Sequence, residues 1–144
     1  RKERYMRHLI KEEGSLTSLR QNLIERALID YVDIRKGDFA ETDFMGDRFS
    51  MIFCDITHDC EEIGKNMPKI KKLLSNDYIL ICDDIRNVEM FNSVKYMIDP
   101  ELAYFDKHML FCGSGKRARR ILGKTSIGSL SPHKKFGESG SEGH

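Results

Sequence analysis

The clearest hydrophobic pattern runs from Phe49 to Asn87, where two short apolar runs flank a segment with helical spacing. The runs Phe49–Cys54 and Tyr78–Cys82 are nearly continuous in apolar side chains, which is typical of parallel strands covered on both faces. Between them, apolar residues recur every three or four positions and predict a helix with one buried face. These residues are Ile63, Met67, Ile70, Leu73 and Leu74. The pattern therefore predicts a strand–helix–strand unit.

Two further elements are expected before this unit. Leucine and isoleucine side chains form one face over Ser15–Leu28, which predicts a helix that begins at a Ser15 N-cap and covers a core. The alternating run Tyr31–Arg35, followed by Lys36-Gly37-Asp38, predicts a strand and a turn. The basic segment 1–11 fits either a short strand or the end of a helix, and the two acids that follow it are most simply a solvated charged loop.

The residues after Asn87 predict one more helix and a hairpin. The helix begins near Val88 and ends before Pro100, because the residue that precedes a proline avoids the helical region. The short runs Glu101–Asp106 and Met109–Cys112 are separated by two residues, which indicates two antiparallel strands.

The central helix carries two local signals. Asp59 is placed to cap its first turn, with Glu62 at the third helical position as the second half of a capping box. Pro68 lies further along and removes one backbone hydrogen bond, so we expect a kink or a restart of the helix there.

Each strand of the central unit ends in acid. Asp55 follows the first strand, and Asp83 and Asp84 follow the second. Neighbouring parallel strands lie about 4.8 Å apart and end at one edge, where open α/β folds bind ligands, so we expect the three carboxylates to converge. His58 lies close to Asp55 in the sequence and is a candidate general base; a surface or capping role is the alternative.

This succession of strand, Asp, nearby His, helix with a late Pro, strand and Asp-Asp resembles the second half of class I S-adenosylmethionine-dependent methyltransferases. Its closest likeness is to the metal-dependent O-methyltransferases of the macrocin and cephalosporin-hydroxylase type. The resemblance implies an α/β, Rossmann-like methyltransferase sheet, mostly parallel, with a C-terminal antiparallel hairpin. It also implies a divalent cation, taken as Mg²⁺, on Asp55, Asp83 and Asp84. The sequence departs from the family at Asn76-Asp77, where the family usually has a Gly-Gly turn.

The resemblance further implies S-adenosylmethionine as the cofactor. Glu12 and Glu13 lie near the family position that receives the ribose hydroxyls, and Asp38 matches the acid beside the adenine amino group. Asp55 is assigned to the cofactor as well as to the cation. The alternatives are a charged loop at Glu12 and Glu13 and an ordinary turn at Asp38.

The front of the family fold has no counterpart in the sequence pattern. The family's first strand lies at the centre of its sheet, next to the strand carried here by Phe49–Cys54, and a glycine-rich cofactor loop follows that first strand. Nothing before Glu12 supplies either feature. Either a preceding segment or a partner chain completes the sheet, or the domain has lost the cofactor and serves as an interaction module.

Composition sets the outer limits. The chain has 144 residues, 40% hydrophobic and 33% charged, with a formal net charge of +1, which suits one domain. No apolar run approaches the length of a membrane span, and no signal peptide is visible. Four cysteines without a CxxC pair favour a reducing, cytoplasmic setting.

The character of the chain changes after Gly115. Residues 116–144 carry seven Lys or Arg against two Glu and are rich in Ser and Gly from Thr125 onward. We therefore expect a partial methyltransferase-like domain over 1–115 and a flexible tail with a basic root over 116–144. The KRARR segment suits phosphate contacts or a localisation signal, and nucleic-acid binding is a secondary expectation. The Gly-Ser-Gly at 113–115 is more simply a strand exit than a cofactor loop.

Two functions follow from these expectations. The first is metal-assisted O-methylation of a small hydroxylated substrate, which makes the chain an enzyme or part of one. The second is a non-catalytic Rossmann-like interaction module. A phosphoacceptor receiver-like domain is a weaker third, because it needs a Lys at the end of a later strand and the hairpin offers none.

Overall fold

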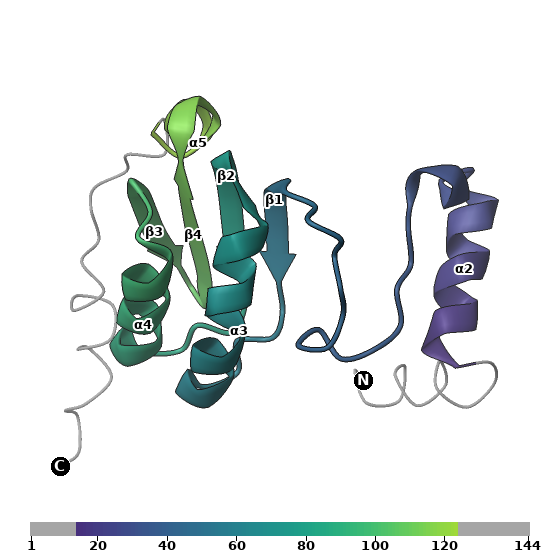
Figure 1. The fold of residues 1–144 in the computed structure, drawn as a ribbon, viewed down its shortest axis with the longest axis horizontal. Coiled ribbons are helices and arrows are strands. Elements are labelled where there is room, and N and C mark those ends of the chain that lie inside the picture. Colours follow the sequence, from purple (N-terminus) through teal and green to yellow (C-terminus); the bar gives the residue numbers. More distant parts are fainter. Residues whose placement is uncertain (1–13, 124–144) are drawn as a thin grey trace, which may run out of the picture. The chain divides into compact units, whose positions relative to one another are not determined.

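The computed structural model describes residues 14–123. The chain divides into two compact units, Arg1–Gly37 and Asp38–His144. Figure 1 labels the helices and strands.

The first unit contains the helix α2 (Ser15–Glu25) and the short 3-10 helix η1 (Ile29–Tyr31). The predicted helix is confirmed, but Gly14 rather than Ser15 is its N-cap, and it ends early, before Ala27 turns to a positive φ of 53°. The expectation that its apolar face covers a core is wrong for the described residues, because no residue of α2 is buried. The strand predicted over Tyr31–Arg35 is also wrong, since no neighbouring strand pairs with that segment there.

The second unit is built on a four-stranded sheet in the order β1-β2-β4-β3. Its strands are β1 (Phe49–Cys54), β2 (Leu74–Cys82), β3 (Leu102–Asp106) and β4 (Met109–Ser114). β1 and β2 are parallel, whereas β4 runs antiparallel to both β2 and β3. The α/β class and the hairpin are therefore confirmed. The expectation of a mostly parallel sheet is corrected, because the hairpin sends β4 back against β2 and leaves one parallel pair.

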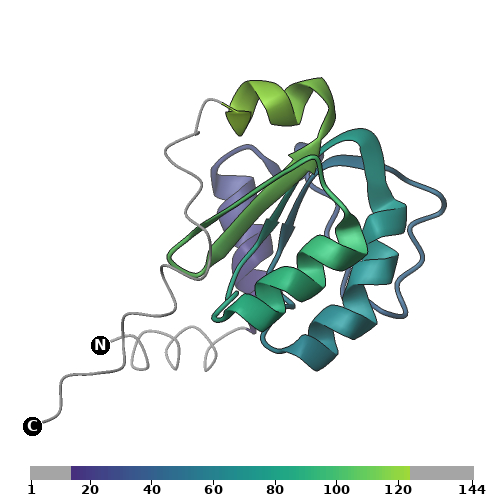
Figure 2. The same cartoon turned by 90° about the vertical axis from the view of Figure 1, so that its left-hand side faces the viewer.

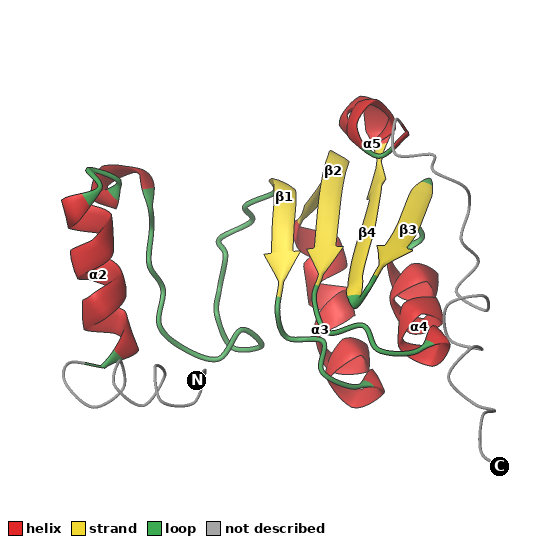
Figure 3. Cartoon of the chain, turned by 180° about the vertical axis from the view of Figure 1, so that it is seen from behind, coloured by secondary structure: helices red, strands yellow, loops and turns green. Residues whose placement is uncertain are grey.

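Two helices cover one face of this sheet. α3 (Cys60–Leu73) and α4 (Val88–Ile98) lie side by side behind the strands in Figure 3 and along one side of them in Figure 2. Their apolar faces bury against inward-facing strand residues such as Leu80 and Leu110, and this burial is the main stabilising contribution to the unit. On the outer face, Met51 and Phe53 of β1 are 56% and 58% exposed.

Both helices begin where the sequence predicts, but the capping box expected at α3 is only half formed, because the Glu62 carboxylate accepts the N–H of His58 instead of that of Asp59. The Asp59 side chain accepts a hydrogen bond from the Glu62 backbone N–H, and Asn87 caps α4 in the same way. α3 continues without interruption through Pro68, so the expected restart is wrong. None of the helices described is both long and apolar enough to span a lipid bilayer.

A last helix, α5 (Gly115–Ile121), forms where a tail was expected. Its start is held by the Asp77 carboxylate, which accepts the backbone N–H of Arg117 at 2.8 Å. Its buried Ala118 packs so close to the sheet that a Cβ on Gly113 would lie 2.9 Å from the Ala118 Cβ and 2.4 Å from the Tyr78 carbonyl oxygen. The predicted tail is therefore corrected over residues 116–121, and residues 124–144 lie outside the described residues.

Candidate metal site at the end of the parallel strands

The parallel pair brings the two acidic strand ends together. Cys54 of β1 pairs with Cys82 of β2, and the Asp83 N–H donates to the Cys54 carbonyl at 2.9 Å, which extends the pairing by one residue. The fully buried Thr57 then returns toward β2, and its hydroxyl donates to the Asp83 carbonyl at 2.7 Å. The loop after β1 is thus fixed against the end of β2.

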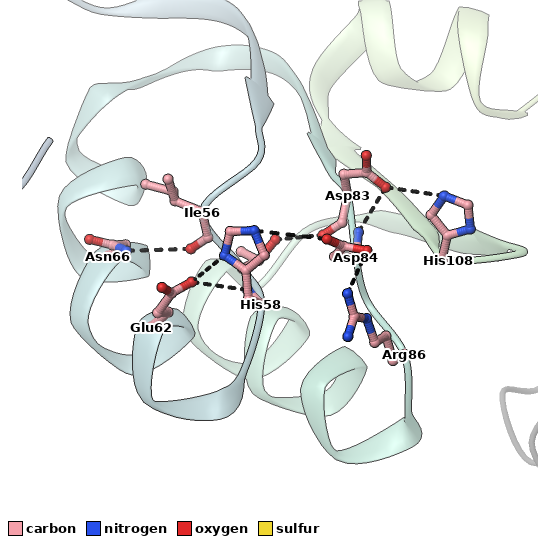
Figure 4. Close-up of polar contacts among 9 residues, drawn as sticks. Ile56, His58, Glu62, Asn66, Asp83, Asp84, Arg86 and His108 are labelled. Atoms are coloured by element: carbon pink, nitrogen blue, oxygen red, sulfur yellow. Dashed lines mark hydrogen bonds and ion pairs between the residues drawn. The ribbon is translucent and has the colours of Figure 1, made fainter. Parts of the chain in front are cut away.

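Backbone conformation sends the two neighbouring acids in different directions. Asp84 has a φ of 59°, in the left-handed region, and its N–H donates to the Asp83 carboxylate at 2.8 Å. Asp83 Oδ1 lies 3.3 Å from His108 Nε2, on the hairpin turn. Asp84 instead faces His58, with 3.8 Å between its Oδ2 and His58 Nε2, and its Oδ1 lies 3.1 Å from Arg86 Nη2. Figure 4 shows the two acids pointing toward these separate partners.

The residues that meet are Asp55, His58 and Asp84. One ligand atom from each lies within 4.8 Å of the other two. Two of the three acids expected to hold a cation are therefore brought together. The third, Asp83, is engaged by His108, and the imidazole of His58 takes its place in the cluster.

His58 is oriented by the first turn of α3. Its Nδ1 lies 2.7 Å from Glu62 Oε2, and the same oxygen accepts the His58 backbone N–H at 3.1 Å. The hydrogen bond and the charge of Glu62 raise the pKa of His58, with smaller contributions from the Asp84 and Asp55 carboxylates. In return, the backbone N–H and the side chain of His58 lower the pKa of Glu62.

The donor set fits a divalent cation. Donors bound to one ion at about 2.1 Å stand no more than about 4.2 Å apart, so small rotations of the exposed Asp55 and His58 side chains would bring the three atoms to a common ion. Two carboxylate oxygens suit Mg²⁺ and Mn²⁺, whereas an imidazole nitrogen suits transition metals. Because His58 rather than Asp83 belongs to the cluster, the donor set favours Mn²⁺ over the Mg²⁺ expected from the sequence.

Of the residues expected to bind the cofactor, the structure describes Asp38 and Asp55. Glu12 and Glu13 lie outside the described residues. Asp38 forms an exposed turn in which its carboxylate accepts the Ala40 N–H at 2.8 Å, and it lies outside the Asp55–His58–Asp84 cluster. Of the two described candidates, Asp55 is part of the cluster and Asp38 is not.

Lys69 of α3 holds the loop that follows Asp38. Its ammonium donates to three backbone carbonyls, at 2.5 Å to Phe39, 2.9 Å to Ala40 and 2.6 Å to Thr42. It also lies 5.0 Å and 5.4 Å from the ring centroids of Phe39 and Phe44. The position of Asp38 therefore depends on a residue of the central helix.

The sequence did not predict the roles of four residues, which are Glu62, Arg86 and His108 next to the acidic residues and Lys69 at the Asp38 loop. The pairing of Glu62 with His58 carried a signal, because residues four apart meet on one side of a helical turn. Arg86 lies two residues after Asp84 in a loop, so only its opposite charge indicated an ion pair. His108 and Lys69 carried none, because their partners are distant in sequence or are backbone carbonyls.

Comparison with known proteins assigns no family. No family model matches the chain, no curated protein matches it, and no solved structure matches it. Functional inference therefore starts from the geometry of this site and from the sequence resemblance.

Proposed function

We propose that the carboxyl ends of β1 and β2 form a divalent-metal site that serves the O-methylation of a small hydroxylated substrate by S-adenosylmethionine. The observation that carries the proposal is the approach of Asp55, His58 and Asp84 to within 4.8 Å at the end of a parallel strand pair. Open α/β sheets bind their ligands at this place.

Asp55, Asp84 and His58 would have different roles at this site. A divalent cation bound here would lower the pKa of a substrate hydroxyl. Asp55 and Asp84 supply negative charge to hold the cation, and their mutual repulsion falls when it binds. His58 contributes Nε2, because its Nδ1 is already directed at Glu62.

The geometry favours a ligand role for His58 over the general-base role expected from the sequence. A neutral imidazole with its proton on Nδ1 has one free lone pair, on Nε2. That lone pair can bind a cation or accept a substrate proton, but it cannot do both at once. Nε2 lies 3.8 Å from the Asp84 carboxylate, among the other two candidate ligands, which favours the cation.

The described residues do not by themselves fit S-adenosylmethionine. Within residues 14–123, no glycine turn follows a strand at this edge, and Asp38 is an exposed turn residue. The methyl-transfer half of the proposal is supported by the sequence resemblance and by the outer edge of β1, which pairs with no other strand within residues 14–123. In the Rossmann-like methyltransferase sheet that the resemblance implies, the first strand lies beside this edge, so an N-terminal segment or a partner chain would complete both sheet and cofactor pocket.

Two observations favour the alternative, a non-catalytic interaction module. Arg86 and His108 already offer positive or polar partners to Asp84 and Asp83, so the chain itself offsets part of the acidic charge. Met51 and Phe53 also expose an apolar surface of the kind that contacts other proteins. Cofactor binding separates the two functions.

Calorimetric titration with S-adenosylhomocysteine tests the methyl-transfer proposal. We expect residues 1–144 alone to bind no tighter than about millimolar, because a loss of about 4 kcal/mol of contacts converts a micromolar ligand into a millimolar one. A longer form that carries the strand beside β1 should bind in the micromolar range. Micromolar binding by residues 1–144 would refute this account of the pocket, and absence of binding by the longer form would favour the interaction module.

A further inference from the structure

We propose that Glu62 is a positioning residue that holds the proton of the neutral His58 ring on Nδ1 and so presents the Nε2 lone pair to Asp55 and Asp84. The inference rests on the metal site proposed above. It concerns a residue that does not itself belong to the candidate ligand set.

The hydrogen bonds of Glu62 determine which ring nitrogen of His58 carries the proton. Glu62 Oε2 lies 2.7 Å from His58 Nδ1 and 3.1 Å from the His58 backbone nitrogen. An ionised carboxylate only accepts hydrogen bonds, so Nδ1 must be the donor when the ring is neutral. The remaining lone pair is then on Nε2, which lies 3.8 Å from Asp84 Oδ2.

The carboxylate of Glu62 is held in place by the start of α3. The Glu62 backbone N–H donates to the Asp59 carboxylate at 2.8 Å, which fixes the first turn of the helix. Glu62 then reaches back to both the backbone and the ring of His58, four residues earlier, as Figure 4 shows. The helix start thus couples the backbone of the loop after β1 to the orientation of the imidazole.

Without such a partner the ring would present the wrong nitrogen. Free imidazole side chains favour the proton on Nε2, which would direct an N–H rather than a lone pair toward Asp84. Carboxylate partners of metal-binding histidines typically contribute about 10- to 100-fold in metal affinity. Because the His58 and Glu62 side chains are 49% and 42% exposed, water competes for this hydrogen bond, and we expect a change near the lower end of that range.

The test measures the tautomer and the metal affinity separately. Long-range proton–nitrogen NMR spectra of the metal-free protein, above the titration midpoint of His58, should show Nδ1–H in the wild type and in Glu61→Gln. Glu61 is an exposed neighbour in the same turn and is the matched charge control. Glu62→Ala should shift the proton to Nε2, and Glu62→Gln, which keeps an acceptor oxygen and the helix start, should give an intermediate population.

Mn²⁺ binding, measured by electron paramagnetic resonance, should weaken about tenfold in Glu62→Ala and remain unchanged within about twofold in Glu61→Gln. An Nε2–H tautomer in the wild type would overturn the inference, whatever the protein does with Mn²⁺. Equal Mn²⁺ affinity in the wild type and Glu62→Ala would also overturn it. Absence of Mn²⁺ binding by a wild type with the Nδ1–H tautomer would overturn the metal site instead.

Discussion

Replacement of Lys69 by methionine should release the loop that begins at Asp38. The ammonium of Lys69 donates to three carbonyl groups of this loop and lies near two phenylalanine rings. Methionine keeps most of the apolar stem and removes the charge and all three donors. The substitution therefore isolates the polar anchor from the packing of the side chain.

The expected loss of stability depends on how far the Lys69 side chain is exposed to water. A hydrogen bond to a charged group contributes about 1.5–3 kcal/mol when buried, and a cation near an aromatic face contributes about 0.5–1 kcal/mol when exposed. Lys69 is half-buried, so water can replace part of each bond to Phe39, Ala40 and Thr42. We expect a net loss of about 2 kcal/mol rather than the sum of the three bonds.

Hydrogen exchange is the direct assay. The backbone N–H groups of Glu41 and Thr42 both donate to the Asp38 carbonyl, at 3.1 Å and 3.0 Å. A loss of about 2 kcal/mol should speed their exchange about 30-fold. If the loop unfolds with the rest of the unit, the melting temperature should also fall by about 8 °C or more.

Lys65→Met is the matched control on the same helix. The Lys65 side chain is 61% exposed, and its Nζ lies 4.0 Å from the Asp38 carboxylate, so removal of this charge should change exchange and melting little. Equal effects of Lys65→Met and Lys69→Met, or no effect of either, would refute the anchoring role of Lys69.

Three further predictions concern the packing and the titratable groups. Gly113→Ala should destabilise the second unit clearly in urea unfolding, because the new Cβ would lie 2.4 Å from the Tyr78 carbonyl oxygen, whereas Gly64→Ala, with open space at its Cβ, should not. Burial raises the pKa of the Cys112 thiol to about 12, so a maleimide at neutral pH should label the partly exposed Cys60 and spare Cys112 until the protein unfolds. Because the folded-state pKa of His58 is raised, the protonated form of His58 stabilises the fold. This contribution is complete below the unfolded-state pKa and is lost as the pH rises through the folded-state pKa. Glu62→Gln should therefore reduce stability more at about pH 5.5 than at about pH 9, and an equal loss at both would contradict the assigned cause.

The central unit could be predicted because local signals agreed with the final packing. The apolar runs located β1 and the end of β2, and Asp59 marked the start of α3. β2 begins at Leu74, four residues earlier than expected. The sequence did not predict this first part because residues 75–77 are polar. The convergence of Asp55 and Asp84 followed from the strand ends alone.

The errors arose where contacts distant in sequence decide the structure. The run Tyr31–Arg35 has strand-like alternation, but a strand also needs a partner for its backbone groups. The charged α5 resembles a solvated tail in sequence, but contacts with distant residues such as Asp77, and the space at Gly113, make it a packed helix. Asp83 and Asp84 cannot be told apart by sequence, because the φ of Asp84 decides which acid faces His58.

The central claim is that Asp55, His58 and Asp84 together hold a divalent cation. Calorimetric titration of the intact chain with Mn²⁺, and with Mg²⁺ for comparison, tests it most directly. We predict one site that prefers Mn²⁺, with binding lost in Asp55→Asn, His58→Asn and Asp84→Asn.

Asp83→Asn is the matched control for this titration, because the asparagine oxygen can still accept the Asp84 N–H while the charge beside His108 is removed. This variant should retain binding within about threefold, as a charge outside the ligand set contributes only through partly screened electrostatics. Absence of Mn²⁺ binding by the wild type, or equal loss in Asp83→Asn and Asp84→Asn, would contradict the proposed site.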